Sequence, residues 1–259
     1  MRDKAGPLIN LHLSTVGENA AALAREHGLG IEIAEFSYAR NMDTDFPHWA
    51  AVTHANLKGI GRRIFHAPHN ELCPAAVDPL IADVTRQRLE QAYKLMLHFG
   101  INRMVVHSGY VPHLYFKSWF TERSVHFWRD FLADKSPDFS LLLENVMEEE
   151  PGILRDIVEK TGDTRLQLCL DIGHAGGIFS DLPVAHWIET CVPCLGHVHV
   201  HNNYRTGDLH NPPGDGLIDM KAALTQIAEL RPSATYTVET ADLRSAVAWF
   251  ERCGFLARP

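Results

Sequence analysis

The sequence predicts an α/β fold, a single (β/α)8 barrel (a TIM barrel) that occupies residues 1–259 as one domain. Short apolar runs typical of strands alternate eight times with longer segments of helical spacing, which favours a parallel sheet with a helix after each strand. The chain has 259 residues, and barrels of this type run to about 250. The alternative is an open doubly wound sheet, but no glycine-rich nucleotide-binding motif follows any of the runs.

Four strand–helix pairs are expected in the first half of the chain. The first helix is expected to stop at Gly28, and the best-defined one to begin at Asp78-Pro79 and to end at Gly100. The strands are expected at 8–13, 31–36, 64–66 and 104–107, and the helices at 18–27, 47–58, 79–99 and within 110–128. The apolar face of the third helix is expected at Ile81, Val84, Ala92, Leu95, Met96 and Phe99.

The second half repeats this alternation. Its last helix is expected to stop at Gly254. The strands are expected at 141–144, 166–171, 197–201 and 236–239, and the helices at 153–160, 184–189, 220–230 and 243–253.

Composition limits the class of protein. Hydrophobic residues make up 46% of the chain, enough for a large core, but no stretch approaches the roughly 20 apolar residues of a membrane span. The first six residues lack the apolar core of a signal peptide, and five cysteines, an odd number, indicate reduced thiols. We therefore expect a cytoplasmic protein with no membrane partner. Both a monomer and an oligomer are compatible with the sequence.

The charge balance bears on nucleic-acid binding. A formal net charge of −8 and the lack of a dense Lys/Arg run disfavour duplex DNA as the main partner, because phosphate binding is normally accompanied by a basic excess. A small-molecule substrate is expected instead.

Six of the apolar runs end in side chains that bind metals. In a barrel, the C-terminal ends of the strands form the active-site face, so these side chains are expected to meet there. His, Asp and Glu without cysteine favour Zn²⁺, Mn²⁺ or a related divalent ion. Taken singly, each carboxylate has a helix cap or a loop salt bridge as its alternative. The side chains are His66, His107, Glu144, Asp171, the histidines within 197–201, and Glu239.

Further candidates lie nearby. His197, His199 and His201 share one face of the seventh strand because the side-chain period is two, and the one nearest the C-terminal end of the strand is the best ligand candidate. His174 follows Asp171 by three residues. Asp208-Leu-His210 lies in the next loop and offers a further clamp. For His66 and His107 the alternative is a buried histidine that donates to a backbone carbonyl. The strand parity of Glu32 predicts that its side chain faces inward, where this acid would support the metal ligands.

These motifs, with the opening segment Asn10-Leu-His12-Leu-Ser14, resemble the xylose isomerase-like barrels, and specifically the endonuclease IV type. The resemblance implies up to three metal ions, with Zn²⁺ expected first and Mn²⁺ or Co²⁺ as alternatives. It implies that Glu144 bridges two ions, one also held by His66 and His107. Asp171, His199 and Glu239 would complete the second, and His174, Asp208 and His210 would hold the third.

Two functions follow from the resemblance. The preferred one is a metal-dependent phosphodiesterase acting on a small or nucleotide-containing phosphoester; His107-Ser-Gly-Tyr110 and 197–203 resemble barrels that include cobamide-remodelling phosphodiesterases. The alternative is a sugar or sugar phosphate isomerase/epimerase that needs only four ligands and uses Glu144 and Glu239 as catalytic acid and base. Arg205, six residues past His199, matches that branch's substrate-binding arginine. The expected substrate-binding residues are His12, His201 and Arg205.

Overall fold

Eight parallel strands close into a barrel in chain order, with β1 paired to β8. The computed structural model describes residue 6, residue 8 and residues 10–257. The predicted barrel is confirmed. The strands are β1 (Leu11–Ser14), β2 (Gly30–Ile33), β3 (Arg63–His66), β4 (Arg103–His107), β5 (Ser140–Glu144), β6 (Leu166–Asp171), β7 (Leu195–Val200) and β8 (Thr235–Val238).

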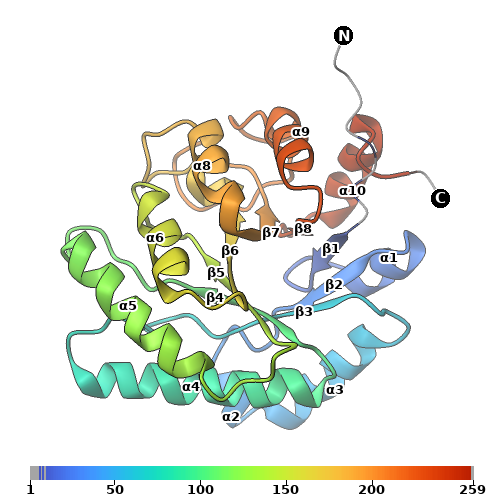
Figure 1. Cartoon of the computed structure of the whole chain (residues 1–259). Helices are drawn as coiled ribbons and strands as arrows, with labels where there is room; N and C mark the ends of the chain where they lie inside the picture. The colour runs from blue at the N-terminus through green and yellow to red at the C-terminus, as the bar shows by residue number, and fades with distance from the viewer. Residues whose placement is uncertain (1–5, 7, 9, 258–259) are drawn as a thin grey trace.

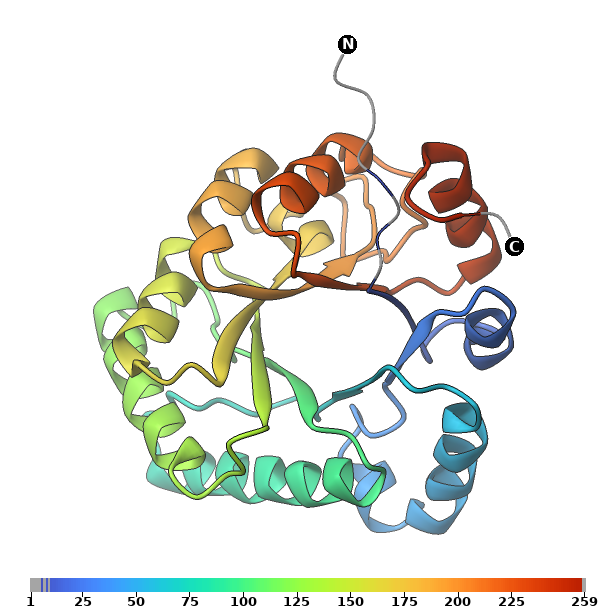
Figure 2. The ribbon, with the colours of Figure 1, turned by 45° about the vertical axis from the view of Figure 1, so that its right-hand side comes forward.

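The helices form a ring outside the strands, as Figures 1 and 2 show from two directions. None of the helices in the described part of the chain is both long and apolar enough to cross a membrane. The longer helices are α1 (Ala20–Glu26), α3 (Phe46–Leu57), α4 (Pro79–His98), α5 (Lys117–Leu132), α6 (Gly152–Thr161), α8 (Val184–Cys191), α9 (Met220–Leu230) and α10 (Leu243–Cys253).

Three short helices were not expected from the sequence: α2 (Arg40–Asp43), α7 (Ile172–Ala175) and the 3-10 turn η1 (Val192–Cys194). Helix α7 forms because the Asp171 carboxylate accepts a hydrogen bond from the His174 backbone N at 2.7 Å, which caps the helix. This turn fixes His174 directly beyond the end of β6.

Two expected strand boundaries were wrong at the start of the chain. The first strand was expected at 8–13, but Leu8 donates its N–H to the Phe255 carbonyl, and β1 begins at Leu11; Ile9 lies outside the described residues. The second strand was expected to reach Phe36, but β2 ends at Ile33 because the next N–H, that of Ala34, donates to the Thr15 hydroxyl at 2.8 Å.

The expected apolar face of α4 was wrong in its first turns. Ile81 and Val84 are 47% and 51% exposed. The buried position there is Thr85, whose hydroxyl accepts from the Cys73 N–H at 3.0 Å, so a hydrogen bond rather than apolar packing ties this end of α4 to the preceding loop. The later part of the face is buried as expected, at Ala92, Leu95, Met96 and Phe99.

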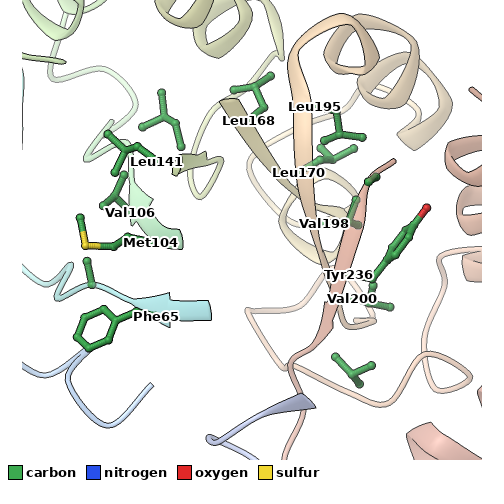
Figure 3. Packing of buried hydrophobic residues seen from close by; sticks show 14 of the residues in the cluster. Phe65, Met104, Val106, Leu141, Leu168, Leu170, Leu195, Val198, Val200 and Tyr236 are labelled. Atoms are coloured by element: carbon green, nitrogen blue, oxygen red, sulfur yellow. The ribbon is translucent and has the colours of Figure 1, made fainter. Parts of the chain in front are cut away.

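The core has two parts, separated by the wall of the barrel. The larger part lies between strands and helices, where outward-facing residues such as Phe65, Val106 and Val198 pack (Figure 3). The smaller, apolar part contains Ile64, Val105, Leu142 and Cys169, which alternate with the outward residues and so face the barrel interior. It comes from β3 to β6 only.

On the other side of the barrel interior the inward positions are polar. They are fully buried or nearly so, and they come from β1, β2, β7 and β8. The residues are His12, Glu32, His197, His199, Thr235 and Thr237. An interior that is apolar on one side and polar on the other places a hydrogen-bonded network directly below the C-terminal ends of the strands.

Candidate metal centre

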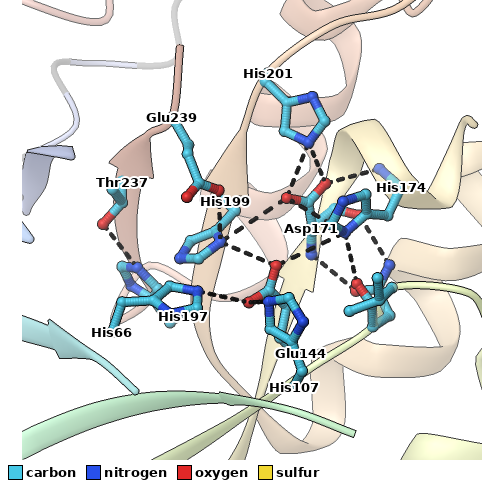
Figure 4. A network of polar contacts seen from close by, with 12 residues as sticks. His66, His107, Glu144, Asp171, His174, His197, His199, His201, Thr237 and Glu239 are labelled. Atoms are coloured by element: carbon cyan, nitrogen blue, oxygen red, sulfur yellow. Dashed lines mark hydrogen bonds and ion pairs between the residues drawn. The ribbon is translucent and has the colours of Figure 1, made fainter. Parts of the chain in front are cut away.

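All nine side chains predicted as metal ligands converge at the C-terminal end of the barrel, and all of them except Asp208 and His210 are labelled in Figure 4. The strands deliver six of them from their last residues or just beyond, and α7 and the loop after β7 deliver His174, Asp208 and His210. They form three neighbouring groups, here called the first, central and outer clusters. No ligand candidate is left apart from the others.

The central cluster consists of Glu144, Asp171, His199 and Glu239, whose ligand atoms lie within 4.8 Å of one another. The Nδ1 atom of His199 lies 3.2 Å from a Glu144 oxygen, 3.2 Å from a Glu239 oxygen and 3.8 Å from an Asp171 oxygen. Three buried carboxylates thus face one imidazole nitrogen. Such a concentration of negative charge is costly in a protein interior unless a cation balances it.

The first cluster consists of His66, His69 and His107 beside Glu144. The Nε2 atoms of His66 and His107 both lie 3.4 Å from the second oxygen of Glu144. Nδ1 of His66 lies 2.9 Å from the Ala67 carbonyl, and a donated hydrogen bond there leaves Nε2 with its lone pair toward Glu144. His66 can therefore donate to a backbone carbonyl through Nδ1 and bind a metal through Nε2 at the same time.

The outer cluster consists of His174, His201, Asp208 and His210. The Asp208 carboxylate lies 3.3 Å from Nε2 of His174 and 3.1 Å from Nε2 of His210. Nδ1 of His174 lies 2.8 Å from the Asn145 carbonyl, and Nδ1 of His210 lies 3.1 Å from the Glu239 carbonyl. The Nε2 atom of each histidine is therefore available as a metal ligand. The Asp208 side chain is 52% exposed, which makes this cluster the one most open to solvent.

The carboxylates and histidines of the site stabilise one another's charged forms. Burial favours the neutral form of Glu144, but His199 and His107 hold the pKa of this carboxyl well below its ordinary value. Burial likewise opposes protonation of His66, but the adjacent Glu144 carboxylate raises the pKa of His66 to about 9. In His199, burial is again outweighed by surrounding acidic groups, and the pKa lies well above the ordinary value. Ionised carboxylates therefore require positive charge here, from protons or from a metal.

The donor set fits divalent metal ions. Ligand atoms around a tetrahedral ion with bonds of about 2.0–2.1 Å stand roughly 3.3 Å apart. The observed 3.2 and 3.4 Å separations in the first and central clusters match that spacing. Moreover, Oε2 of Glu144 is fully buried and accepts no hydrogen bond from the described residues. Such an unsatisfied oxygen is expected where a cation normally binds.

Two of the three residues expected to bind substrate, His12 and Arg205, lie apart from the ligand set. His12 is buried inside the barrel, with Nδ1 3.1 Å from the Tyr236 carbonyl, and it borders a cavity lined by Arg62, Arg63 and other residues next to the starts of the strands. The guanidinium of Arg205 contacts the Ser180 carbonyl at 2.8 Å and the Asp181 carboxylate at 3.0 Å.

His201 is fully buried behind Asp171. Its Nε2 lies 2.9 and 3.0 Å from the two Asp171 oxygens, and its ring stacks on that of His210 at 3.9 Å between centroids. It thus belongs by geometry to the outer cluster.

His69 was not singled out from the sequence, but its ring stacks on that of His107 at 4.1 Å between centroids. The signal in the sequence was its spacing of three residues from His66, but the turn that folds it back over β4 was not foreseeable. Glu32 was singled out correctly by parity as inward-facing, and the structure places its carboxylate 3.1 Å from Nε2 of His199.

A cavity of about 380 Å³ adjoins the clusters. His69, His107 and Asp208 line it beside the metal-binding groups, and the rest of the lining is mostly apolar or aromatic, with Tyr110 and Met147 among it. Its volume suits a small organic ligand.

A closed parallel barrel with His, Asp and Glu clustered at the C-terminal ends of its strands defines the class of protein to which this chain belongs. The chain belongs to the xylose isomerase-like TIM barrel family, whose model matches residues 21–253. A curated relative, the uncharacterised protein MJ1311 of Methanocaldococcus jannaschii, is 25% identical over 197 residues. The match covers 71% of this chain and 66% of the relative, just under two thirds of the relative's length.

Several solved structures share the fold. The TTHB071 protein from Thermus thermophilus, soaked with ZnCl2, has a TM-score of 0.75 at 22% identity and covers 97% of this chain and 100% of its own. A D-tagatose 3-epimerase-like protein has a TM-score of 0.74 at 21% identity, with coverage of 94% and 95%. Endonuclease IV from Thermus thermophilus has a TM-score of 0.64 at 20% identity, with coverage of 94% and 99%. At these identities the likeness shows the fold alone. The family includes both sugar epimerases and endonuclease IV enzymes.

Proposed function

We propose that the protein is a metal-dependent phosphodiesterase that acts on a small or nucleotide-containing phosphoester, with a cobamide as one candidate substrate. The observation that carries the proposal is the outer cluster. Its Asp208 carboxylate joins His174 and His210 within 3.3 Å, directly beside the four-ligand core. A sugar isomerase has no use for a third group of ligands, whereas phosphoester cleavage by several ions does.

The ligand set supports up to three ions, with Zn²⁺ as the first expectation and Mn²⁺ or Co²⁺ as alternatives. Bound ions would supply a more acidic water, an anchor for the phosphate and charge neutralisation at the leaving oxygen. Glu144 would link the first and central clusters through its two oxygens, one facing His66 and His107 and the other facing His199. The exposed edge of the outer cluster leaves room for a phosphate.

The adjoining cavity supports a small substrate. A phosphate at the clusters would leave its apolar or ring-containing substituent against Tyr110, Val146 and Met147. The cavity of about 380 Å³ has room for one such group rather than for a long stretch of duplex.

The alternative is a sugar or sugar phosphate isomerase/epimerase. Its specific support is the central cluster, where carboxylate oxygens of Glu144 and Glu239 each lie 3.2 Å from Nδ1 of His199, so two glutamates are present at one site to serve as acid and base. Against it stands Arg205, whose guanidinium is engaged by Ser180 and Asp181.

The decisive test is the Asp208→Ala/His210→Ala double variant. We expect about three ions per wild-type chain and about two per variant chain by elemental analysis. Loss of one ion should remove roughly 3 kcal/mol of transition-state stabilisation or more, so cleavage of bis(p-nitrophenyl) phosphate should fall at least about 100-fold. The matched control is Asp215→Ala, an acidic residue of the same loop that accepts a hydrogen bond from Tyr204, which should retain all ions and full activity.

Arg205→Ala separates the two chemistries further. A phosphodiesterase should keep its metals and most of its activity in this variant, whereas an epimerase that grips sugar oxygens through Arg205 should lose turnover. A double variant that keeps every ion, or a wild type with one ion and epimerase activity on ketohexoses, would contradict the phosphodiesterase proposal.

A further inference from the structure

Glu32 is a carboxylate sealed inside the barrel below the metal clusters. It belongs to β2, it is 0% exposed, and it is not among the nine expected ligands. A buried carboxylate costs several kcal/mol of folding free energy unless it is hydrogen bonded or paired with a positive group. Its contacts therefore indicate what it does.

Each Glu32 oxygen has a different partner. Oε1 lies 3.1 Å from Nε2 of His199. Oε2 accepts a hydrogen bond from the Thr237 hydroxyl at 2.6 Å and lies 3.3 Å from Nε2 of His197. His197 is held in turn by the hydroxyls of Thr235 at 2.6 Å and Thr237 at 2.9 Å (the contact with Thr237 is visible in Figure 4). The carboxylate is therefore fixed from β7 and β8 while one oxygen remains directed at His199.

The two nitrogens of His199 face opposite ways. Nδ1 faces the carboxylates of Glu144, Glu239 and Asp171, and Nε2 faces Glu32. A neutral imidazole carries one N–H, and an acceptor at Nε2 places the proton there and leaves the Nδ1 lone pair for a metal. The ring of His199 separates Glu32 from the ion that Nδ1 would bind, so Glu32 is not a ligand of the central cluster.

We propose that Glu32 is a positioning residue that holds His199 through the 3.1 Å contact between its Oε1 and Nε2 of the imidazole, and thereby strengthens divalent-metal binding at the central cluster. A carboxylate behind a metal-binding histidine fixes the tautomer and the orientation of the ring and increases its basicity as a ligand. The inference rests on the metal centre of the proposed function and not on the reaction, so it holds for either chemistry.

The test is the affinity of purified, metal-stripped protein for Zn²⁺, measured by competition with a chromophoric chelator. Glu32→Gln keeps the size and an acceptor oxygen but removes the charge, and it should weaken binding of one ion about 10- to 100-fold. The number of ions bound at saturating Zn²⁺ should stay as in the wild type. In protein labelled with ¹⁵N-histidine, the Nε2–H signal of zinc-loaded His199 should be present in the wild type and shifted in Glu32→Gln.

Two further variants keep the test informative. Thr237→Val removes the hydroxyl that holds Glu32 but leaves the charge, and binding should weaken about 3- to 10-fold, the effect of one hydrogen bond. It also serves if Glu32→Gln does not fold. Glu35→Gln is the matched control, because Glu35 is a buried glutamate just beyond the same strand that contacts Thr15 and Asn56, and its affinity for Zn²⁺ should equal that of the wild type.

The outcomes distinguish failure of this inference from failure of the proposed function. A wild type that binds no divalent ion would overturn both. Wild-type binding with unchanged Zn²⁺ affinity in Glu32→Gln and Thr237→Val, even with lower thermal stability, would make Glu32 merely structural and overturn this inference alone. Loss of a whole ion from Glu32→Gln at saturation would make Glu32 a ligand and overturn it as well.

Discussion

Glu144 is the residue at which the first and central clusters meet. One of its oxygens lies 3.4 Å from His66 and His107, and the other lies 3.2 Å from His199. Its side chain is 1% exposed, so the charge has no water to stabilise it and depends on these neighbours. A single side chain thus determines the geometry of two groups of ligands, and both candidate chemistries need it.

We expect Glu144→Gln to abolish activity under either mechanism. The substitution keeps the shape of the side chain but removes the charge that links the two clusters, and it replaces one carboxylate oxygen, a potential metal ligand, with an amide NH2 group that cannot bind a metal. Turnover should fall by at least about 1,000-fold, equivalent to roughly 4 kcal/mol, and metal content should fall by at least one ion per chain. Steady-state kinetics and elemental analysis of the same preparation check both.

The matched control is Glu148→Gln. Glu148 is buried four residues further on, and it accepts hydrogen bonds from the Ser108 hydroxyl and the Val146 N–H rather than from metal-binding histidines. Burial raises the pKa of Glu148, and a Gln at this position keeps the size of the side chain and an acceptor oxygen. Parental turnover in Glu144→Gln would remove the four-ligand core from the proposed function.

At the scale of elements, β7 and the turn after β6 shape the outer cluster together. Strand β7 carries His197 and His199 inward, and His201 follows just beyond its end. His201 packs over Gly173 in α7, where an added Cβ would lie 2.1 Å from Cε1 of His201. Only glycine at this position leaves His201 room to contact Asp171 and stack on His210.

Gly173→Ala should therefore displace His201 and loosen the outer cluster. We expect a loss of about 1–3 kcal/mol in unfolding free energy, typical of overpacking, together with weaker metal binding. Denaturant unfolding of the metal-free protein and zinc titration measure the two effects separately. Gly152→Ala in the first turn of α6 is the control, because nothing lies within 4 Å of an added Cβ there, and unchanged metal affinity in both variants would contradict the role given to His201.

The elements could be predicted wherever one local pattern governs them. Strand β6 and helices α9 and α10 have the expected bounds because an apolar period and a stop signal coincide there. The nine ligand candidates could be placed on one face because strand parity and barrel topology fix where strand ends lie. The position of Arg205 could not be predicted, because it depends on a loop with a positive φ of 60° that turns the side chain toward Asp181.

His69 and His201 show the same limit. Their places beside His107 and Asp171 result from long-range packing of rings across loops, and spacing along the chain does not encode such contacts. His12 follows the parity rule but lies inside the barrel beside Gly30, because an inward residue near the start of a strand is buried rather than delivered to the site.

For the whole molecule, the balance of charge bears on the class of substrate that we propose. The chain has 32 acidic residues against 24 Lys and Arg, a formal net charge of −8. A protein that binds duplex DNA normally gains most of its affinity from Lys and Arg at the phosphates. The excess negative charge and the small cavity beside the candidate metal centre therefore support our proposal of a compact substrate rather than a long polyanion.

We predict weak binding to duplex DNA and no efficient incision at abasic sites. In fluorescence anisotropy with a labelled duplex that contains one abasic site, binding should not saturate at micromolar protein near physiological salt, because few counterions can be released from the phosphates. Zinc-loaded protein that cleaves bis(p-nitrophenyl) phosphate serves as the positive control, so that absence of nicking is not mistaken for an inactive preparation. Tight binding that weakens steeply between about 50 and 200 mM salt, together with nicking at the abasic site, would instead make the protein a DNA repair enzyme whose basic contacts are local.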